Sequence, residues 1–174
     1  MRKLTFKGFL SQYVKKLSYT NTMDLKRLAD EAATSNYRLC APLVLYSLAT
    51  GREKQLLYFL QSNRAASDMQ KTLLDLSKGS LEERLASGLV PDEYSKVWNS
   101  FLVARDAPKR DDDLKGAMRK KILAIQKEKN CSSYRVYTDL HLNPGNINSW
   151  LKNGDCTKVS YQTAEKVMNY VLQY

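Results

Sequence analysis

The sequence predicts an all-α protein made of two helical domains. Most segments repeat apolar residues at intervals of three and four positions, whereas alternating runs typical of strands are short and rare. Glycine and proline are scarce, at 7 and 4 of 174 residues, which argues against a turn-rich β-sandwich or barrel. With 43% hydrophobic and 26% charged residues, the chain resembles a soluble protein that can bury a core.

Residues 1–107 are predicted to form a helical domain. Its first helix follows from one apolar stripe, made of Phe6, Phe9, Leu10, Tyr13, Val14 and Leu17. A second helix is expected to begin after a Thr22 cap, and a third to begin with Pro42 in its first position. Further amphipathic segments are predicted at Glu53–Gln61, Asp68–Leu76, Ser80–Ala86 and Asp92–Val103. The role of this domain stays open between oligomerisation, ligand sensing and partner binding.

A short linker is predicted between residues 107 and 113. Pro108 is followed by two cations and then by Asp111, Asp112 and Asp113, and carboxylates stabilise the first turn of a helix. The second domain is therefore expected to span residues 113–174.

Four helices are predicted in the second domain. A stripe of Leu114, Met118, Ile122 and Ile125 indicates a helix that ends near Asn130. Ser132 or Ser133 can cap a short second helix, and Asn143 followed by Pro144 is a typical start for a third. Asn153-Gly154 is a stop signal, and Ser160 can cap the last helix.

The charge is strongly positive and is denser in the second domain. The chain carries a net charge of +10, and residues 109–174 hold 12 basic and 7 acidic side chains. Such an excess suits a phosphate backbone. No segment is apolar and long enough for a signal peptide or a membrane span, so we expect a cytoplasmic protein without a membrane partner.

The third helix of the second domain is predicted to present amide, hydroxyl and ammonium groups outward. Ile147, Trp150 and Leu151 face inward in this arrangement, and the polar face is formed by Asn146, Asn148, Ser149 and Lys152. Two short helices joined by a tight turn, with such a face on the second, are typical of a major-groove reader. Asparagine can pair with adenine, and serine and lysine with several base or phosphate groups.

The stretch from Leu114 to Leu172 resembles a lambda-repressor-like helix-turn-helix domain of the Cro/repressor type. The resemblance rests on residues 140–154, LHLNPGNINSWLKNG, in which Ile147 and Trp150 match the apolar anchors of the recognition helix. His141 stands where the family often has glycine, and histidine tolerates a left-handed backbone. Tyr137 stands where the family often has alanine, so it is expected to separate the two helices or to point outward.

The resemblance implies a set of DNA contacts. The base-reading residues would be Asn146, Asn148, Ser149 and Lys152. The phosphate contacts would be Ser133, Tyr134, Arg135, Asn143 and Lys158. The implied function is a sequence-specific transcription regulator, a repressor, that binds double-stranded DNA as a homodimer.

Two other classes of function compete with this one. The alternative is a phage- or mobile-element-encoded inhibitor, whose first domain blocks a host nucleoprotein enzyme while the helix-turn-helix domain represses its own promoter. An enzyme is not favoured, because the single histidine, His141, lies in a predicted turn without a nucleophile arrangement. Neither a metal site nor a cofactor is predicted, since Cys40, Cys131 and Cys156 are widely spaced and are expected to be reduced thiols.

Overall fold

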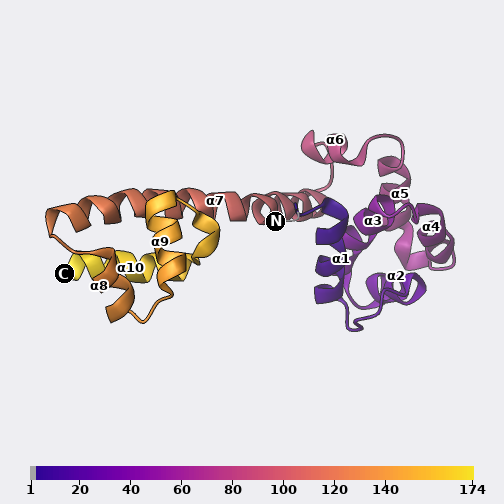
Figure 1. The fold of residues 1–174 in the computed structure, drawn as a ribbon. Helices are drawn as coiled ribbons and strands as arrows, with labels where there is room; N and C mark the ends of the chain where they lie inside the picture. The colour runs from indigo at the N-terminus through magenta and orange to yellow at the C-terminus, as the bar shows by residue number, and fades with distance from the viewer. Residues whose placement is uncertain (1–2) are drawn as a thin grey trace. The chain divides into compact units, whose positions relative to one another are not determined.

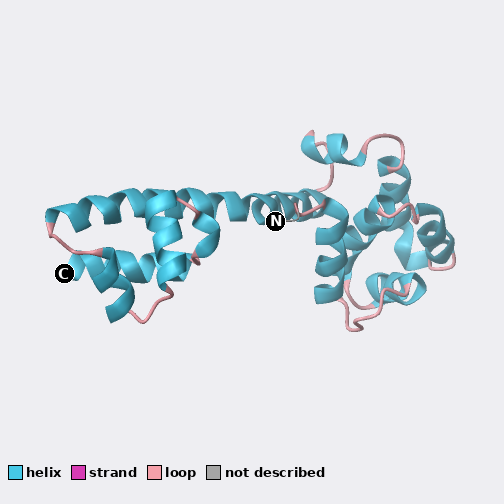
Figure 2. Cartoon of the chain, viewed as in Figure 1, coloured by secondary structure: helices cyan, strands magenta, loops and turns pink. Residues whose placement is uncertain are grey.

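The fold is all-helical in the computed structural model, which describes residues 3–174. Helices and connecting loops account for every described segment, and none of these residues forms a strand (Figure 2). The described helices include none that is both long enough and apolar enough to cross a membrane. The chain divides into two compact units, Met1–Arg105 (unit 1) and Asp106–Tyr174 (unit 2), and each has a hydrophobic core.

Unit 1 is built from a series of short helices (Figure 1). The α-helices are α1 (Phe6–Leu17), α2 (Leu25–Thr34), α3 (Cys40–Ala49), α4 (Glu53–Gln61), α5 (Ser67–Leu76), α6 (Leu81–Ala86) and the first part of α7 (Asp92–Glu128), and the 3₁₀ helices are η1 (Tyr37–Leu39) and η2 (Arg64–Ala66). Helix α3 is buried along most of its length and packs against α1, α4 and α5. The central position of α3 follows from its composition, because an apolar helix without a polar face is stable only when neighbours surround it.

Two helix starts in unit 1 differ from the expected positions. Helix α2 is capped by Asp24 rather than Thr22, and the Asp24 carboxylate accepts from the backbone amides of Lys26 and Arg27. Helix α3 begins at Cys40, so Pro42 is its third residue rather than its first. A proline is tolerated there because the first four amides of a helix have no intrahelical acceptor.

The predicted linker at residues 107–113 is wrong, because these residues lie inside the long helix α7 (Asp92–Glu128). Pro108 removes one helical hydrogen-bond donor. The carbonyl that loses its donor belongs to Ala104, four residues earlier, and Ala104 is partly exposed, so water can reach that carbonyl. Asp112 does not cap a helix start but pairs with Lys115, at 2.9 Å, one turn further along.

Unit 2 contains the last part of α7 together with α8 (Ser133–Asp139), α9 (Pro144–Asn153), the 3₁₀ helix η3 (Cys156–Lys158) and α10 (Tyr161–Gln173). Its core is formed by Ile122, Cys131, Val136, Ile147, Trp150, Leu151, Val159, Ala164, Val167 and Val171. Helix α8 packs against α9 and α10, and α9 packs against η3.

The buried face of α7 in unit 2 differs from the predicted stripe. Ile122 is fully buried, but Leu114 is 43% exposed, while Lys115 is only 7% exposed. The Lys115 ammonium donates to the carbonyl oxygens of Cys156 (2.7 Å) and Val159 (3.3 Å). A buried cation is stable here because it is paired with Asp112 and hydrogen-bonded.

Candidate nucleic-acid interface

The turn between α8 and α9 has the local chemistry that the sequence predicts. His141 has φ = 53°, in the left-handed region that histidine tolerates better than most residues. The Asn143 side-chain oxygen accepts from the backbone amide of Asn146 at 3.0 Å and so caps α9, with Pro144 in the first helical position. Gly154 ends α9 in the left-handed conformation, with φ = 78°. Both ends of α9 are therefore fixed by local signals.

Helix α9 has one buried face and one polar face. Ile147, Trp150 and Leu151 are at most 1% exposed and anchor the helix in the core of unit 2. On the other side, Asn146 and Lys152 are exposed, while Asn148 and Ser149 are half-buried. All four predicted base-reading side chains thus have some contact with solvent. Asn146 and Lys152 are the most accessible of them.

The predicted phosphate contacts are distributed over three segments. Tyr134 and Arg135 lie exposed in the first turn of α8, and Ser133, at its first position, is half-buried. Asn143 and Lys158 are exposed at the start of α9 and at the end of η3. The Asn143 oxygen is committed to its cap, which leaves only its amino group to donate outward.

A small polar network holds the Arg135 guanidinium. Its Nη1 donates to the Tyr174 hydroxyl at 2.9 Å, its centre lies 5.3 Å from the Tyr174 ring centroid, and its Nε is 3.8 Å from the Asp139 carboxylate. Tyr170 donates its hydroxyl proton to the same carboxylate at 2.5 Å. The network thus joins α8 to α10 and restricts an otherwise flexible arginine.

Tyr137 takes neither of its two expected positions completely. It is half-buried and packs against the core of unit 2, and its ring lies edge-on to that of Tyr134 with the centroids 5.5 Å apart. The larger side chain is therefore accommodated at the edge of the core, beside an exposed ring.

Three cations of unit 2 bind the carboxyl ends of helices, a role that the sequence analysis did not assign. Arg119 donates to the last carbonyls of α9, Lys129 to the Leu172 carbonyl in α10 at 2.8 Å, and Lys166 to the Leu140 carbonyl after α8 at 3.3 Å. Carbonyls at a helix end have no intrahelical donor, and cations there also compensate the helix dipole. Each of these three side chains thus has a structural partner in the fold.

The Tyr170–Asp139 hydrogen bond predicts a titration in alkaline solution. This bond is the main cause that raises the pKa of Tyr170 from 10.0 to about 12. The pKa of Tyr170 is higher in the folded state than in the unfolded state. The hydrogen bond to Asp139 therefore stabilises the fold fully below pH 10, and this stabilisation is lost as the pH rises from 10 to about 12.

The expected result can be followed by NMR on tyrosines labelled at the ring carbon that bears the hydroxyl. One resonance with a pKa near 12 should disappear in Tyr170→Phe and move toward 10 in Asp139→Asn. Asp111→Asn, which removes an exposed carboxylate of the same unit, is the control and should leave that resonance unchanged. An unaltered pKa in Asp139→Asn would contradict the assignment.

Searches of protein-family models, curated proteins and solved structures returned no match.

Proposed function

We propose that this chain is a sequence-specific DNA-binding transcription regulator, a repressor, that reads the major groove with α9. The observation that carries the proposal is the division of α9 into a buried apolar face and a polar face of two asparagines, a serine and a lysine. A helix in the major groove must be anchored from behind and must offer hydrogen-bonding groups to base edges. Helix α9 meets both requirements.

The side chains of α9 differ in the base contacts that they can make. Asn146, exposed in the first turn, can form the bidentate pair of hydrogen bonds that distinguishes adenine. Asn148 and Ser149 are half-buried, so they would contact only bases that approach the helix closely. Lys152, at the far end, would reach a guanine edge or a phosphate.

The surrounding residues suit the role of holding the phosphate backbone. The guanidinium of Arg135 is oriented by Tyr174 and Asp139, yet its side chain remains 60% exposed. Tyr134 offers a hydroxyl beside it, and Lys158 offers an ammonium at the end of η3. Such contacts fix the register of a protein on the duplex but carry no sequence information directly.

A homodimer would make the reading specific over a longer site. Two copies of α9 can enter successive major grooves when they are about 34 Å apart, which corresponds to one turn of the duplex. The operator is then expected to consist of two inverted half-sites.

Selection of bound duplexes from a random pool tests the proposal. The full chain should enrich a paired half-site motif. Asn146→Ala should weaken binding to that motif by about 1–3 kcal/mol and relax selection at one position of each half-site, because it removes a base contact. Arg135→Ala should weaken binding to selected and scrambled duplexes alike, because a phosphate contact is independent of sequence.

Asn169→Ala is the matched control. Asn169 is an exposed asparagine of unit 2 on α10, outside the predicted contact set, and its removal should change neither affinity nor motif. Failure to enrich any motif, or equal affinity of Asn146→Ala and the unaltered chain for the motif, would reject α9 as the reading helix.

A further inference from the structure

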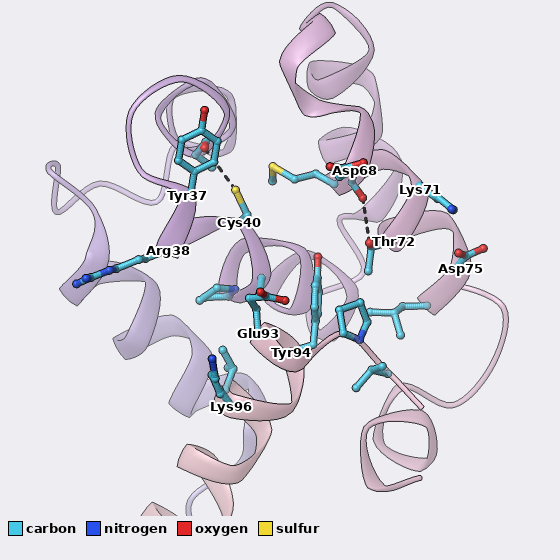
Figure 3. Close-up of a pocket in the computed structure, with 18 of the residues that line it drawn as sticks. Tyr37, Arg38, Cys40, Asp68, Lys71, Thr72, Asp75, Glu93, Tyr94 and Lys96 are labelled. Carbon is cyan, nitrogen blue, oxygen red and sulfur yellow. Dashed lines mark hydrogen bonds between the residues drawn. The ribbon is translucent and has the colours of Figure 1, made fainter. Parts of the chain in front are cut away.

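Unit 1 contains a large open cleft that the proposed DNA contacts do not use. Its volume is about 1240 Å³, and its walls come from α1, α2, η1, α3, η2, α5, α6, the segment that leads into α7 and the first turns of α7 (Figure 3). Much of the wall is apolar, with Leu17, Ala41, Met69, Leu76 and Val97 among its residues. Pockets for organic ligands have predominantly apolar walls with a few placed polar groups.

Tyr94 supplies a buried polar group inside this cleft. The residue is only 6% exposed, and Figure 3 shows its ring standing between the segment of Cys40 and the helix of Thr72, with the hydroxyl on the side of Thr72. Thr72 donates its own hydroxyl proton to the Asp68 carbonyl at 2.9 Å. Thr72 is also a side-chain hydrogen-bond partner of the Tyr94 hydroxyl. A phenolic oxygen has two lone pairs, so that of Tyr94 can still accept from a ligand.

The Tyr94 hydroxyl and the Cys40 thiol both stay protonated, and therefore neutral, in this environment. Burial raises the pKa of the Tyr94 hydroxyl well above its usual range and also raises the pKa of the Cys40 thiol. Cys40 donates to the Ala32 carbonyl at 3.4 Å. Among these neutral groups, the oxygen of Tyr94 is the one available to accept a hydrogen bond from a ligand.

The charges around Tyr94 favour a ligand that is a cation. The carboxylates of Asp68 and Glu93 line the cleft, and no ion pair is formed by either of them within residues 3–174. Each lies in the first turn of its helix, α5 or α7. The dipole of a helix is equivalent to about half a positive charge at its amino end, so a full carboxylate charge is only partly offset.

The cations that line the same cleft are mostly directed elsewhere or already bound. In Figure 3 the charged ends of Arg38 and Lys71 point away from the centre. Arg84 donates to the Asp75 carbonyl, and the Asp75 carboxylate in turn pairs with Lys78 at 3.6 Å. Lys96, on the wall of the cleft one turn after Glu93, forms no ion pair within residues 3–174. The cleft near Tyr94 therefore holds two unpaired carboxylates, those of Asp68 and Glu93, and one unpaired ammonium.

We infer that the cleft of unit 1 is a binding site for an amphipathic organic amine. Its apolar body, of two or three rings, fills the space beside Met69 and Val97. Its ammonium group donates to the Tyr94 oxygen and is attracted by the carboxylates of Asp68 and Glu93. The site is independent of α9, so DNA binding and amine binding can be tested separately.

Isothermal titration of the full chain with three probes tests this inference. The probes share a naphthalene body and differ in the head group: 2-(1-naphthyl)ethylamine, 2-(1-naphthyl)ethanol and 1-naphthaleneacetate. The amine is expected to bind one site with a Kd below about 1 mM, at least about tenfold more tightly than the carboxylate, with the alcohol between them.

Two variants locate the binding at the proposed groups. Tyr94→Phe should weaken amine binding about tenfold, since it removes only the hydroxyl oxygen. Glu93→Gln should weaken it about fivefold, and because Glu93 is exposed this variant does not disturb the core. Asp30→Asn removes an exposed carboxylate of the same unit outside the cleft, and it should leave the affinity unchanged.

Three results would overturn the inference. They are the absence of saturable binding of any probe below about 1 mM, equal affinity for the amine and the carboxylate, and unchanged amine affinity in both Tyr94→Phe and Glu93→Gln. Circular dichroism of each variant confirms that the helices are intact before the affinities are compared.

Discussion

Replacing Trp150 with alanine is expected to lower the free energy of unfolding of unit 2 by about 3–5 kcal/mol. Trp150 is fully buried in the core of unit 2 and is one of the two apolar anchors of α9. The substitution removes the largest buried side chain of that core and leaves a cavity that the short helices can fill only partly. Urea denaturation of the full chain, with hydrogen exchange read at the amides of residues 106–174, measures the loss.

Trp150→Phe is the matched control, and its effect should be less than half as large. The Trp150 indole Nε1 is buried without a hydrogen-bond partner in the described residues. Phenylalanine thus loses part of the apolar volume but breaks no hydrogen bond, and it removes an unpaired donor. If alanine and phenylalanine destabilise unit 2 equally, cavity formation is not the cause.

Arg119→Met is expected to lower the free energy of unfolding of unit 2 by about 2–3 kcal/mol. The guanidinium donates to three consecutive carbonyls at the end of α9: Nε lies 2.9 Å from the oxygens of both Trp150 and Leu151, and Nη2 lies 3.1 Å from that of Lys152. Methionine keeps most of the apolar stem and removes only the charged donors.

Lys120→Met, at the next position of α7, separates this role from a general loss of charge. Lys120 is exposed, and a surface substitution of this kind changes stability by less than about 0.5 kcal/mol. Both variants lower the net charge by one, so equal thermal shifts in the two would show that the contacts to α9 are not what stabilises unit 2.

Much of the helical structure could be predicted because local signals determine it. Asn143, Pro144 and Gly154 act within a few residues of where they stand, and the structure places them at the start and the end of α9 as expected. Burial of Ile147 and Trp150 follows from helical spacing, which the sequence displays directly.

The errors arise where contacts distant in the sequence decide the outcome. Lys115 looks like a solvated lysine on a helical wheel, but its ammonium finds carbonyls 41 and 44 residues away and is buried. Pro108 and the three aspartates look like a break, yet the exposed surface of α7 tolerates them. Neither a tertiary acceptor nor the access of water to one carbonyl can be read from a local pattern.

The outward face of α9 could be predicted from the sequence, but the environment of each side chain on it could not. The sequence indicates which residues of α9 face outward, and the exposed Asn146 and Lys152 agree with it. It does not indicate that Asn148 and Ser149 are half-buried, nor that the hydroxyl oxygen of Tyr174, 39 positions along the chain, accepts a hydrogen bond from Arg135. These details depend on how α10 packs against α8.

The net charge of +10 includes several cations of unit 2 whose side chains are bound to backbone carbonyls. Of the twelve basic side chains in residues 109–174, Lys115, Arg119, Lys129 and Lys166 are held in this way. They still contribute to the long-range potential that attracts a polyanion, since that potential depends on charge rather than on hydrogen bonding. Lys115 is buried and cannot reach a phosphate, so the formal charge overstates the number of close contacts available to unit 2.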